Sequence, residues 1–233
     1  MKTFCTQAVD DVLSLFYPSL CSGCRIHLPH GQRVLCVDCL YGLPLTDYHS
    51  QSVNPLDERF WGRLNVESVT SMCYFSEGGT VQRLIHRLKY QKDVEVGRYL
   101  GEFFGQRLRD SNRFGGIDLI VPVPLHWTRR RQRGYNQSDW FARGLSQGME
   151  RPWDSSVLGR GRKTRSQTSK GRMSRFENVE DAFLVRNMEG LKNKWILLVD
   201  DVMTTGATLE ACGRKILEIP GTRLSFATIA CAT

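Results

Sequence analysis

Three short apolar runs in the second half of the chain limit most strongly what it can fold into. They are IDLIVPVPL, WILLVDD and RLSFATIACA, which begin at residues 117, 195 and 223. Runs of this length and apolarity are typical of strands that are buried on both faces, as in a parallel sheet. Amphipathic helical patterns alternate with them, so the sequence predicts an α/β fold in which helices cover both faces of a parallel sheet.

The neighbouring segments carry the periodicities that such a fold requires. Residues 68–75 predict a further strand, and apolar side chains at helical spacing predict helices over residues 81–88 and 96–108. Two more helices are expected around residues 140–145 and 209–217, one after each of the first two apolar runs.

The composition indicates a globular protein with a positive net charge. The chain has 233 residues, is 41% hydrophobic and carries a net charge of +8, which favours a polyanionic partner or substrate. Asp10 and Asp11 interrupt the apolar stretch that a signal peptide needs, and no later segment is long enough to span a bilayer. We therefore expect a cytoplasmic protein without membrane insertion. We expect two domains, an N-terminal helix with a cysteine-rich ribbon over residues 1–60 and the α/β domain over residues 61–233.

Four cysteines near the N-terminus predict a metal site. They form two CxxC pairs, Cys21 with Cys24 and Cys36 with Cys39. The cytosol keeps thiols reduced, and two such pairs can point four thiolates at one centre, the tetrahedral arrangement of structural zinc. His27 and His30 are spare candidate ligands. A redox CxxC is the competing interpretation, although it needs only one pair, at the start of a helix.

The run LLVDDVMTTGAT, residues 197–208, places two carboxylates and a small, hydroxyl-rich turn at the end of a predicted strand. Ligands bind at the carboxyl ends of parallel strands, and a helix N-terminus there offers unpaired N–H groups to an anion. The turn lets the backbone approach a phosphate, and its threonines can cap the helix. Asp200 and Asp201 would repel a phosphate but suit the two donors of a vicinal diol. The turn consists of Thr204, Thr205, Gly206, Ala207 and Thr208. The pattern predicts a ligand that carries a ribose next to a phosphate.

The run VDDVMTTGAT closely resembles the phosphoribosyl-diphosphate (PRPP) motif of type I phosphoribosyltransferases. A response-regulator receiver also ends a strand in paired aspartates, but only about thirty residues follow here, too few for the rest of that fold. The resemblance implies that Asp200 and Asp201 hold the ribose 2′ and 3′ hydroxyls and act in catalysis. It also implies that residues 204–208 hold the 5′-phosphate.

Residues 118–138 and 162–183, together with the cysteines, resemble the ComF/GntX family of competence-associated proteins that are similar to phosphoribosyltransferases. The resemblance implies a type I phosphoribosyltransferase fold with an N-terminal zinc ribbon. It further implies that Val123 and Pro124 lie in a diphosphate-binding loop and that residues 162–183 form a lid. Residues 119–138 contain no acidic side chain, and their basic loop could bind diphosphate or a nucleic-acid backbone, unless it is an ordinary solvated face. The basic residues of this loop are Arg129, Arg130, Arg131 and Arg133. Residues 155–176 likewise contain no acidic side chain and could bind the same groups; they hold Arg160, with Arg162, Lys163 and Arg165 in the lid.

Two functions of different classes remain open. The first is a protein of DNA uptake that associates with the uptake machinery, binds single-stranded DNA and retains a PRPP site, with Trp127, Tyr135 or Phe176 as stacking platforms. The second is an active PRPP-dependent transferase with an unidentified small acceptor, in which Mg²⁺ bridges the diphosphate and ribose oxygens. An amidotransferase is disfavoured because Cys5 is not N-terminal. The family resemblance favours the first function.

Overall fold

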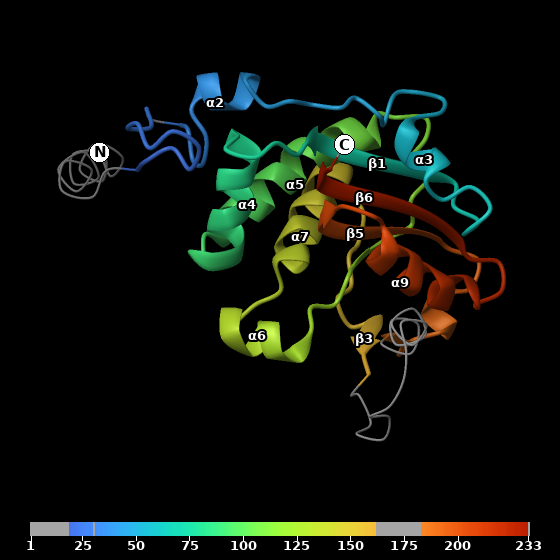
Figure 1. Cartoon of the computed structure of the whole chain (residues 1–233). Coiled ribbons are helices and arrows are strands. Elements are labelled where there is room, and N and C mark those ends of the chain that lie inside the picture. Colours follow the sequence, from blue (N-terminus) through green and yellow to red (C-terminus); the bar gives the residue numbers. More distant parts are fainter. Residues whose placement is uncertain (1–18, 30, 162–182, 233) are drawn as a thin grey trace, which may run out of the picture.

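A four-stranded parallel sheet forms the centre of the protein, in the order β1-β6-β5-β2 (Figure 1). The computed structural model describes residues 19–29, 31–161 and 183–232. The strands are β1 (Ser68–Tyr74), β2 (Leu119–Pro122), β5 (Trp195–Met203) and β6 (Arg223–Cys231). All three pairings are parallel, so the three apolar runs form β2, β5 and β6 as predicted.

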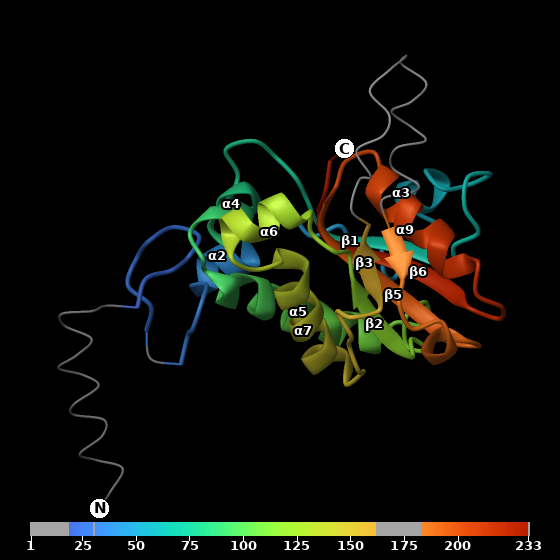
Figure 2. The same ribbon diagram turned by 90° about the horizontal axis from the view of Figure 1, so that it is seen from below.

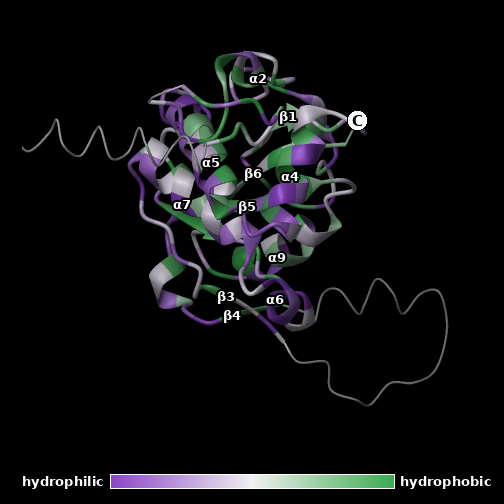
Figure 3. Cartoon of the chain, turned by 90° about the vertical axis from the view of Figure 1, so that its left-hand side faces the viewer, coloured by the Kyte–Doolittle hydropathy of each residue, from purple (hydrophilic) through white to green (hydrophobic). Residues whose placement is uncertain are grey.

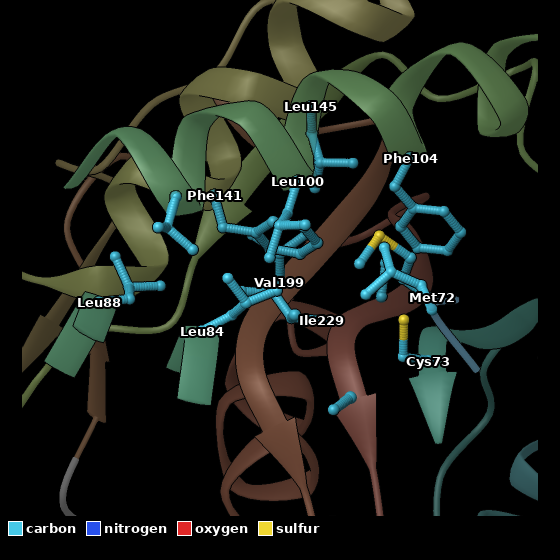
Figure 4. Packing of buried hydrophobic residues seen from close by; sticks show 14 of the residues in the cluster. Met72, Cys73, Leu84, Leu88, Leu100, Phe104, Phe141, Leu145, Val199 and Ile229 are labelled. Atoms are coloured by element: carbon cyan, nitrogen blue, oxygen red, sulfur yellow. The ribbon is translucent and has the colours of Figure 1, made fainter. Parts of the chain in front are cut away.

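Helices cover both faces of this sheet, because its central strands bury alternate side chains on opposite sides. On β5, Leu197 and Val199 contact the core under α4, α5 and α7, while Ile196 and Leu198 contact the core under α3 and α9. Figure 4 shows Val199 and Ile229 of the sheet against side chains of the first helical layer. The helices are α2 (Val37–Tyr41), α3 (Pro55–Glu58), α4 (Thr80–Tyr90), α5 (Val94–Arg109), α6 (Trp127–Arg133), α7 (Gln137–Met149) and α9 (Ala207–Leu217), with a 3₁₀ turn at Glu189–Leu191.

The predicted helices agree with α4, α5, α7 and α9, whose apolar stripes are buried. Two elements differ from expectation. The arginine-rich segment after β2 forms the short helix α6 and not a loop. An antiparallel pair of strands, β3 (Leu158–Arg160) and β4 (Phe183–Val185), lies on either side of the segment that was expected to be the lid.

The cysteine-rich segment packs against the first helical layer. Cys21, Leu28 and Leu35 belong to the same buried cluster as Leu84 of α4 and Leu100 of α5. The chain then runs beside β1, where Leu45 bridges to Cys73 and Asn54 Nδ2 donates to the carbonyl of Val69 at 2.9 Å. The boundary at residue 60 stays a prediction, and the expected N-terminal helix lies largely outside the described residues. Within the described part of the chain, we find no helix with the length and apolarity needed to cross a bilayer.

Candidate functional site

A cavity of about 630 Å³ opens at the carboxyl ends of β2 and β5. Its wall includes Val123 and Pro124 after β2, Asp200 and Asp201 near the end of β5, and Thr208 in the first turn of α9. This is the edge of an open parallel sheet at which ligands ordinarily bind. The structure therefore brings the predicted carboxylates, the predicted diphosphate loop and part of the predicted phosphate turn to one cavity.

The carboxylate of Asp200 is half-buried and held by two donors. Its Oδ1 accepts from Ser138 Oγ at 2.9 Å and from the backbone N–H of Asp201 at 2.8 Å. Burial is the main cause that raises the pKa of Asp200 to about 7, and the neighbouring negative charge of Asp201 adds to it. The two donors and Lys89 act in the opposite direction. The pKa of Asp200 therefore lies near neutral pH, so a bound ligand can determine whether this carboxyl group is charged.

Asp201 is almost fully buried and pairs with a cation from another element. Lys89 at the end of α4 places its Nζ 3.0 Å from Asp201 Oδ1. Among the residues that the structure describes, the other carboxylate oxygen, Oδ2, is buried without a hydrogen-bond partner, and so is Oδ1 of the buried residue Asn136. Asn136 uses its Nδ2 to donate to the carbonyl of Val123 at 3.0 Å. A buried acceptor without a donor is costly, so these two oxygens favour a ligand or ion that supplies donors or positive charge.

The turn of residues 204–208 leads from β5 into α9 and surrounds a small cavity of about 40 Å³ beside Asp200. Gly206 is the N-cap of α9 and has φ +79°. A Cβ at Gly206 would lie 2.7 Å from Phe60 Cζ, so both backbone conformation and space require glycine here. Threonine caps the helix in part: Gly206 at the N-cap has no side chain to offer, but the hydroxyl of Thr205 accepts from the backbone N–H of Ala207 at 3.4 Å. The other N–H groups of this first turn have no intrahelical partner and can serve an external acceptor.

The predicted basic residues divide into three groups. Arg129 and Arg133 line the cavity, whereas Arg130 and Arg131 lie exposed on α6. Figure 3 shows the hydrophilic character of this helix. No ion pair joins these four arginines to a carboxylate within the described part of the chain. The lid residues Arg162, Lys163 and Arg165 lie outside the described residues.

Two further residues, Lys89 and Ser138, contribute to the cavity without having been predicted, and they contact the two aspartates. Arg160, from the basic stretch expected to bind diphosphate or nucleic acid, reaches the cavity from β3 with its guanidinium 4.9 Å from the centre of the Phe183 ring. Burial lowers the pKa of Arg160. Ser138 directly follows the RGYNQ run that carries the family resemblance, so that run offered a signal for it. Lys89 had none, because its approach depends on how distant elements pack.

The four cysteines come together as predicted. The sulfurs of Cys21, Cys24, Cys36 and Cys39 all lie within 4.8 Å of one another. Cys24 Sγ and Cys36 Sγ are 3.6 Å apart, close to the ~3.8 Å edge of a tetrahedron with ~2.3 Å zinc–sulfur bonds. Burial opposes ionisation of Cys21, but backbone N–H donors, including those of Cys36 and Gly23, lower its pKa to about 6. The cluster can hold a metal ion that prefers thiolates, such as zinc.

Sequence comparison supplies the relatives of this chain. No family model matches it. DNA utilization protein YhgH of Escherichia coli (strain K12) is 31% identical over 221 residues, which cover 87% of this chain and 92% of that protein. The chain belongs to the ComF/GntX family. Another similar member is Competence protein F of Haemophilus influenzae, 29% identical over 205 residues that cover 86% of this chain and 85% of that protein.

Structure comparison gives more distant likenesses. Glutamine PRPP amidotransferase from B. subtilis is 15% identical, with a TM-score of 0.43 over 62% of this chain and 30% of that chain. The ComF/GntX protein has a parallel sheet with helices on both faces and a four-cysteine cluster near its N-terminus. The predicted parallel sheet with flanking helices and a four-cysteine cluster near the N-terminus are thus confirmed.

Proposed function

We propose that this protein acts in DNA uptake or utilization, where it binds single-stranded DNA and holds PRPP or a related ribose phosphate in the cavity beside β5. The names of its relatives, a DNA utilization protein and a competence protein, support the biological role. One observation carries the ribose-phosphate part: two aspartates and the N-terminus of α9 flank the same strand end.

The arrangement suits a ribose phosphate for a chemical reason. Asp201 Oδ2 is a buried acceptor without a donor, and a vicinal diol supplies two donors. The N-terminus of α9 supplies N–H groups and a positive dipole end to a phosphate. Val123 and Pro124 lie across the cavity, where Arg129 and Arg160 add positive charge for a diphosphate. Mg²⁺ binds oxygen ligands, so the two aspartates and the diphosphate could hold it together.

We propose that the four-cysteine cluster binds zinc as a structural metal. Its sulfur spacing and the backbone donors to Cys21 support thiolate coordination. A Cβ on Gly23 would lie 2.7 Å from Cys39 Sγ, so the chain must be glycine where it turns around the centre. The metal would then fix the ribbon against α4 and α5.

The proposed DNA surface begins at α6. Arg129, Arg130 and Arg131 are exposed without a carboxylate partner in the described part of the chain, and Trp127 beside them is 59% exposed. Single strands bind through such a combination of backbone cations and aromatic platforms. The double variant Arg130→Glu/Arg131→Glu should weaken binding of a labelled single strand and reduce its salt dependence. Equal affinity and an equal salt slope in this variant and the wild type would contradict the assignment of α6.

The ribose-phosphate site can be tested by the thermal midpoint of unfolding with chosen ligands. Ribose 5-phosphate should raise the midpoint, because a ligand that binds only the folded state stabilises it. The matched control is 2-deoxyribose 5-phosphate, which carries the same phosphate but lacks the vicinal diol. We expect the control to raise the midpoint less at equal concentration. Equal shifts of the midpoint by the two sugars would mean that the aspartates do not recognise the ribose diol. If neither ribose 5-phosphate nor PRPP shifts the midpoint, the proposed ribose-phosphate site is wrong.

A further inference from the structure

A second cavity, of about 700 Å³, lies between the cysteine-rich segment and α4. Its wall includes Ser22 and Arg25 from the cysteine side, with Arg83, His86 and Arg87 from α4. Figures 1 and 2 show α4 between the cysteine-rich segment and α6, so this helix separates the second cavity from the arginine-rich helix.

The second cavity has an excess of positive charge. Arg83 donates only to neutral acceptors, namely the carbonyls of Gly23 at 3.0 Å and Gly78 at 2.8 Å and the hydroxyl of Thr80 at 2.9 Å. Arg25 is exposed, and no ion pair joins it or Arg83 to a carboxylate among the described residues. These two guanidinium groups therefore remain available to an anion.

The carboxylate of Asp93 lies beside the cavity, but it is already paired with residues of the protein. Asp93 accepts from Arg87 NH2 at 2.7 Å and from Ser22 Oγ at 3.0 Å. This network ties the cysteine-rich segment to α4 and neutralises a single arginine. The remaining field is positive, which suits phosphate groups.

Helix α4 connects the two cavities. His86 lines the second cavity, and Lys89 enters the first. Three residues of helix separate them by about 5 Å along the axis. Tyr90 lies next on the outer side and is 62% exposed, with the ring of His86 4.9 Å from its own and the guanidinium of Arg133 5.1 Å away. An exposed aromatic ring beside a guanidinium is an arrangement on which a nucleobase can stack.

The relative position of α4 and α6 is fixed by a direct contact. Tyr135, which follows α6, donates its hydroxyl to the carbonyl of Leu88 near the end of α4. Arg133 therefore stays over Tyr90, and positive and aromatic groups continue from Arg25 across α4 to the first cavity. A mononucleotide would need only one of these cavities, whereas a strand can contact both.

We propose that the second cavity binds phosphate groups of a single-stranded nucleic acid, and that the strand crosses α4 over Tyr90 toward the ribose-phosphate cavity. This inference rests on the proposed function, and it adds a binding surface beside the cysteine centre that is distinct from α6. The positive face of α4 then explains why Arg25 and Arg83, beside the cysteine-rich segment, have no ion pair with a carboxylate among the described residues.

The test measures the affinity of a fluorescent deoxythymidine oligonucleotide by anisotropy at several salt concentrations. Arg25→Glu should weaken binding about tenfold and lower the salt slope by about 0.7 for each phosphate that the variant no longer neutralises. Tyr90→Ala should also weaken binding about tenfold, because the platform for a stacked base is removed. The matched control is Arg33→Glu, which makes the same charge change at an exposed position of the cysteine-rich segment but outside the cavity. Arg33→Glu should stay within about twofold of wild type if only nearby charge matters.

Two checks separate the outcomes. Metal content and the shift of the thermal midpoint by ribose 5-phosphate should be unchanged in Arg25→Glu, which shows that the variant is folded. If the wild type binds the strand and Arg25→Glu and Tyr90→Ala bind it equally well, the second cavity is not a strand site, while the proposed function stands. If the wild type binds no strand, both the inference and the proposed DNA function fail. If thymidine monophosphate displaces the labelled strand as well as unlabelled oligonucleotide does, at the same concentration of phosphate groups, the cavity binds a small nucleotide. The proposal that a strand crosses α4 would then be wrong.

Discussion

Replacement of Asp200 by asparagine should stabilise the protein while it damages the site. The half-buried carboxylate has its pKa raised from the ordinary value of 3.8 to about 7, chiefly by burial and then by Asp201. Folded Asp200 therefore holds its proton more tightly than the unfolded chain does. The wild type accordingly loses stability as the pH rises from about 4 to about 7, and an asparagine at this position avoids that loss.

The magnitude follows from the same values. The change from 3.8 to about 7 corresponds to an upper limit of about 4 kcal/mol, at ~1.4 kcal/mol for each pKa unit. The cavity is open to solvent, which screens the charge, so we expect Asp200→Asn to gain about 2 kcal/mol at pH 8. At pH 5 the gain should be smaller, because Asp200 is then ionised mainly in the unfolded chain. Ser138 and the N–H of Asp201 can still donate to the asparagine oxygen.

Urea unfolding of wild type and Asp200→Asn at pH 5 and pH 8 measures this difference. Asp110→Asn is a suitable control, because it removes an exposed carboxylate paired only at the surface with Arg109, where such pairs contribute about 0–1 kcal/mol. A gain that is equal at the two pH values would contradict the electrostatic explanation, and so would a loss of stability at pH 8. If Asp200→Asn is more stable than the wild type but binds PRPP less well, the wild type keeps a destabilising charge at Asp200 because ligand binding needs it.

Three other changes have defined outcomes. Gly206→Ala should cost about 2–3 kcal/mol in urea unfolding, because it combines positive φ with a contact on Phe60, whereas Gly62→Ala, at positive φ in open space, should cost only about 1 kcal/mol. Cys36→Ser should release the metal and leave the sheet folded, and retention of one zinc per chain by elemental analysis would refute the four-cysteine assignment. Arg160→Ala should weaken PRPP binding about tenfold in calorimetry but leave ribose 5-phosphate binding unchanged, since it is assigned to the diphosphate. An equal effect on both ligands would argue against that assignment.

The sheet and its main helices were predictable from local patterns. Apolar runs give β2, β5 and β6, and the spacing of Val81, Leu84, Ile85 and Leu88 gives α4, because burial on a regular element repeats with that element's period. The four cysteines were equally predictable, since CxxC spacing by itself brings two thiols to one side of a turn.

The chemistry around the aspartates was only half predictable. Asp200 and Asp201 follow from their place at a strand end, and the acid-free basic stretch pointed to Arg160, but Lys89 reaches Asp201 from an element far away in the sequence. Such an approach depends on tertiary packing, which the sequence immediately around the residue does not indicate. The same holds for α6, whose arginines carry no apolar stripe that would reveal a helix.

The most direct test of the account is a calorimetric titration of PRPP with Mg²⁺ into the wild type and into Asp200→Asn/Asp201→Asn. We expect saturable binding of PRPP to the wild type. Binding to the double variant should be at least about tenfold weaker, because two charged hydrogen-bond acceptors for the ribose are removed. The double variant must give the wild-type zinc content and a cooperative unfolding transition for this comparison. Equal affinity of the two proteins, or no binding to the wild type, would contradict a ribose-phosphate site at the end of β5.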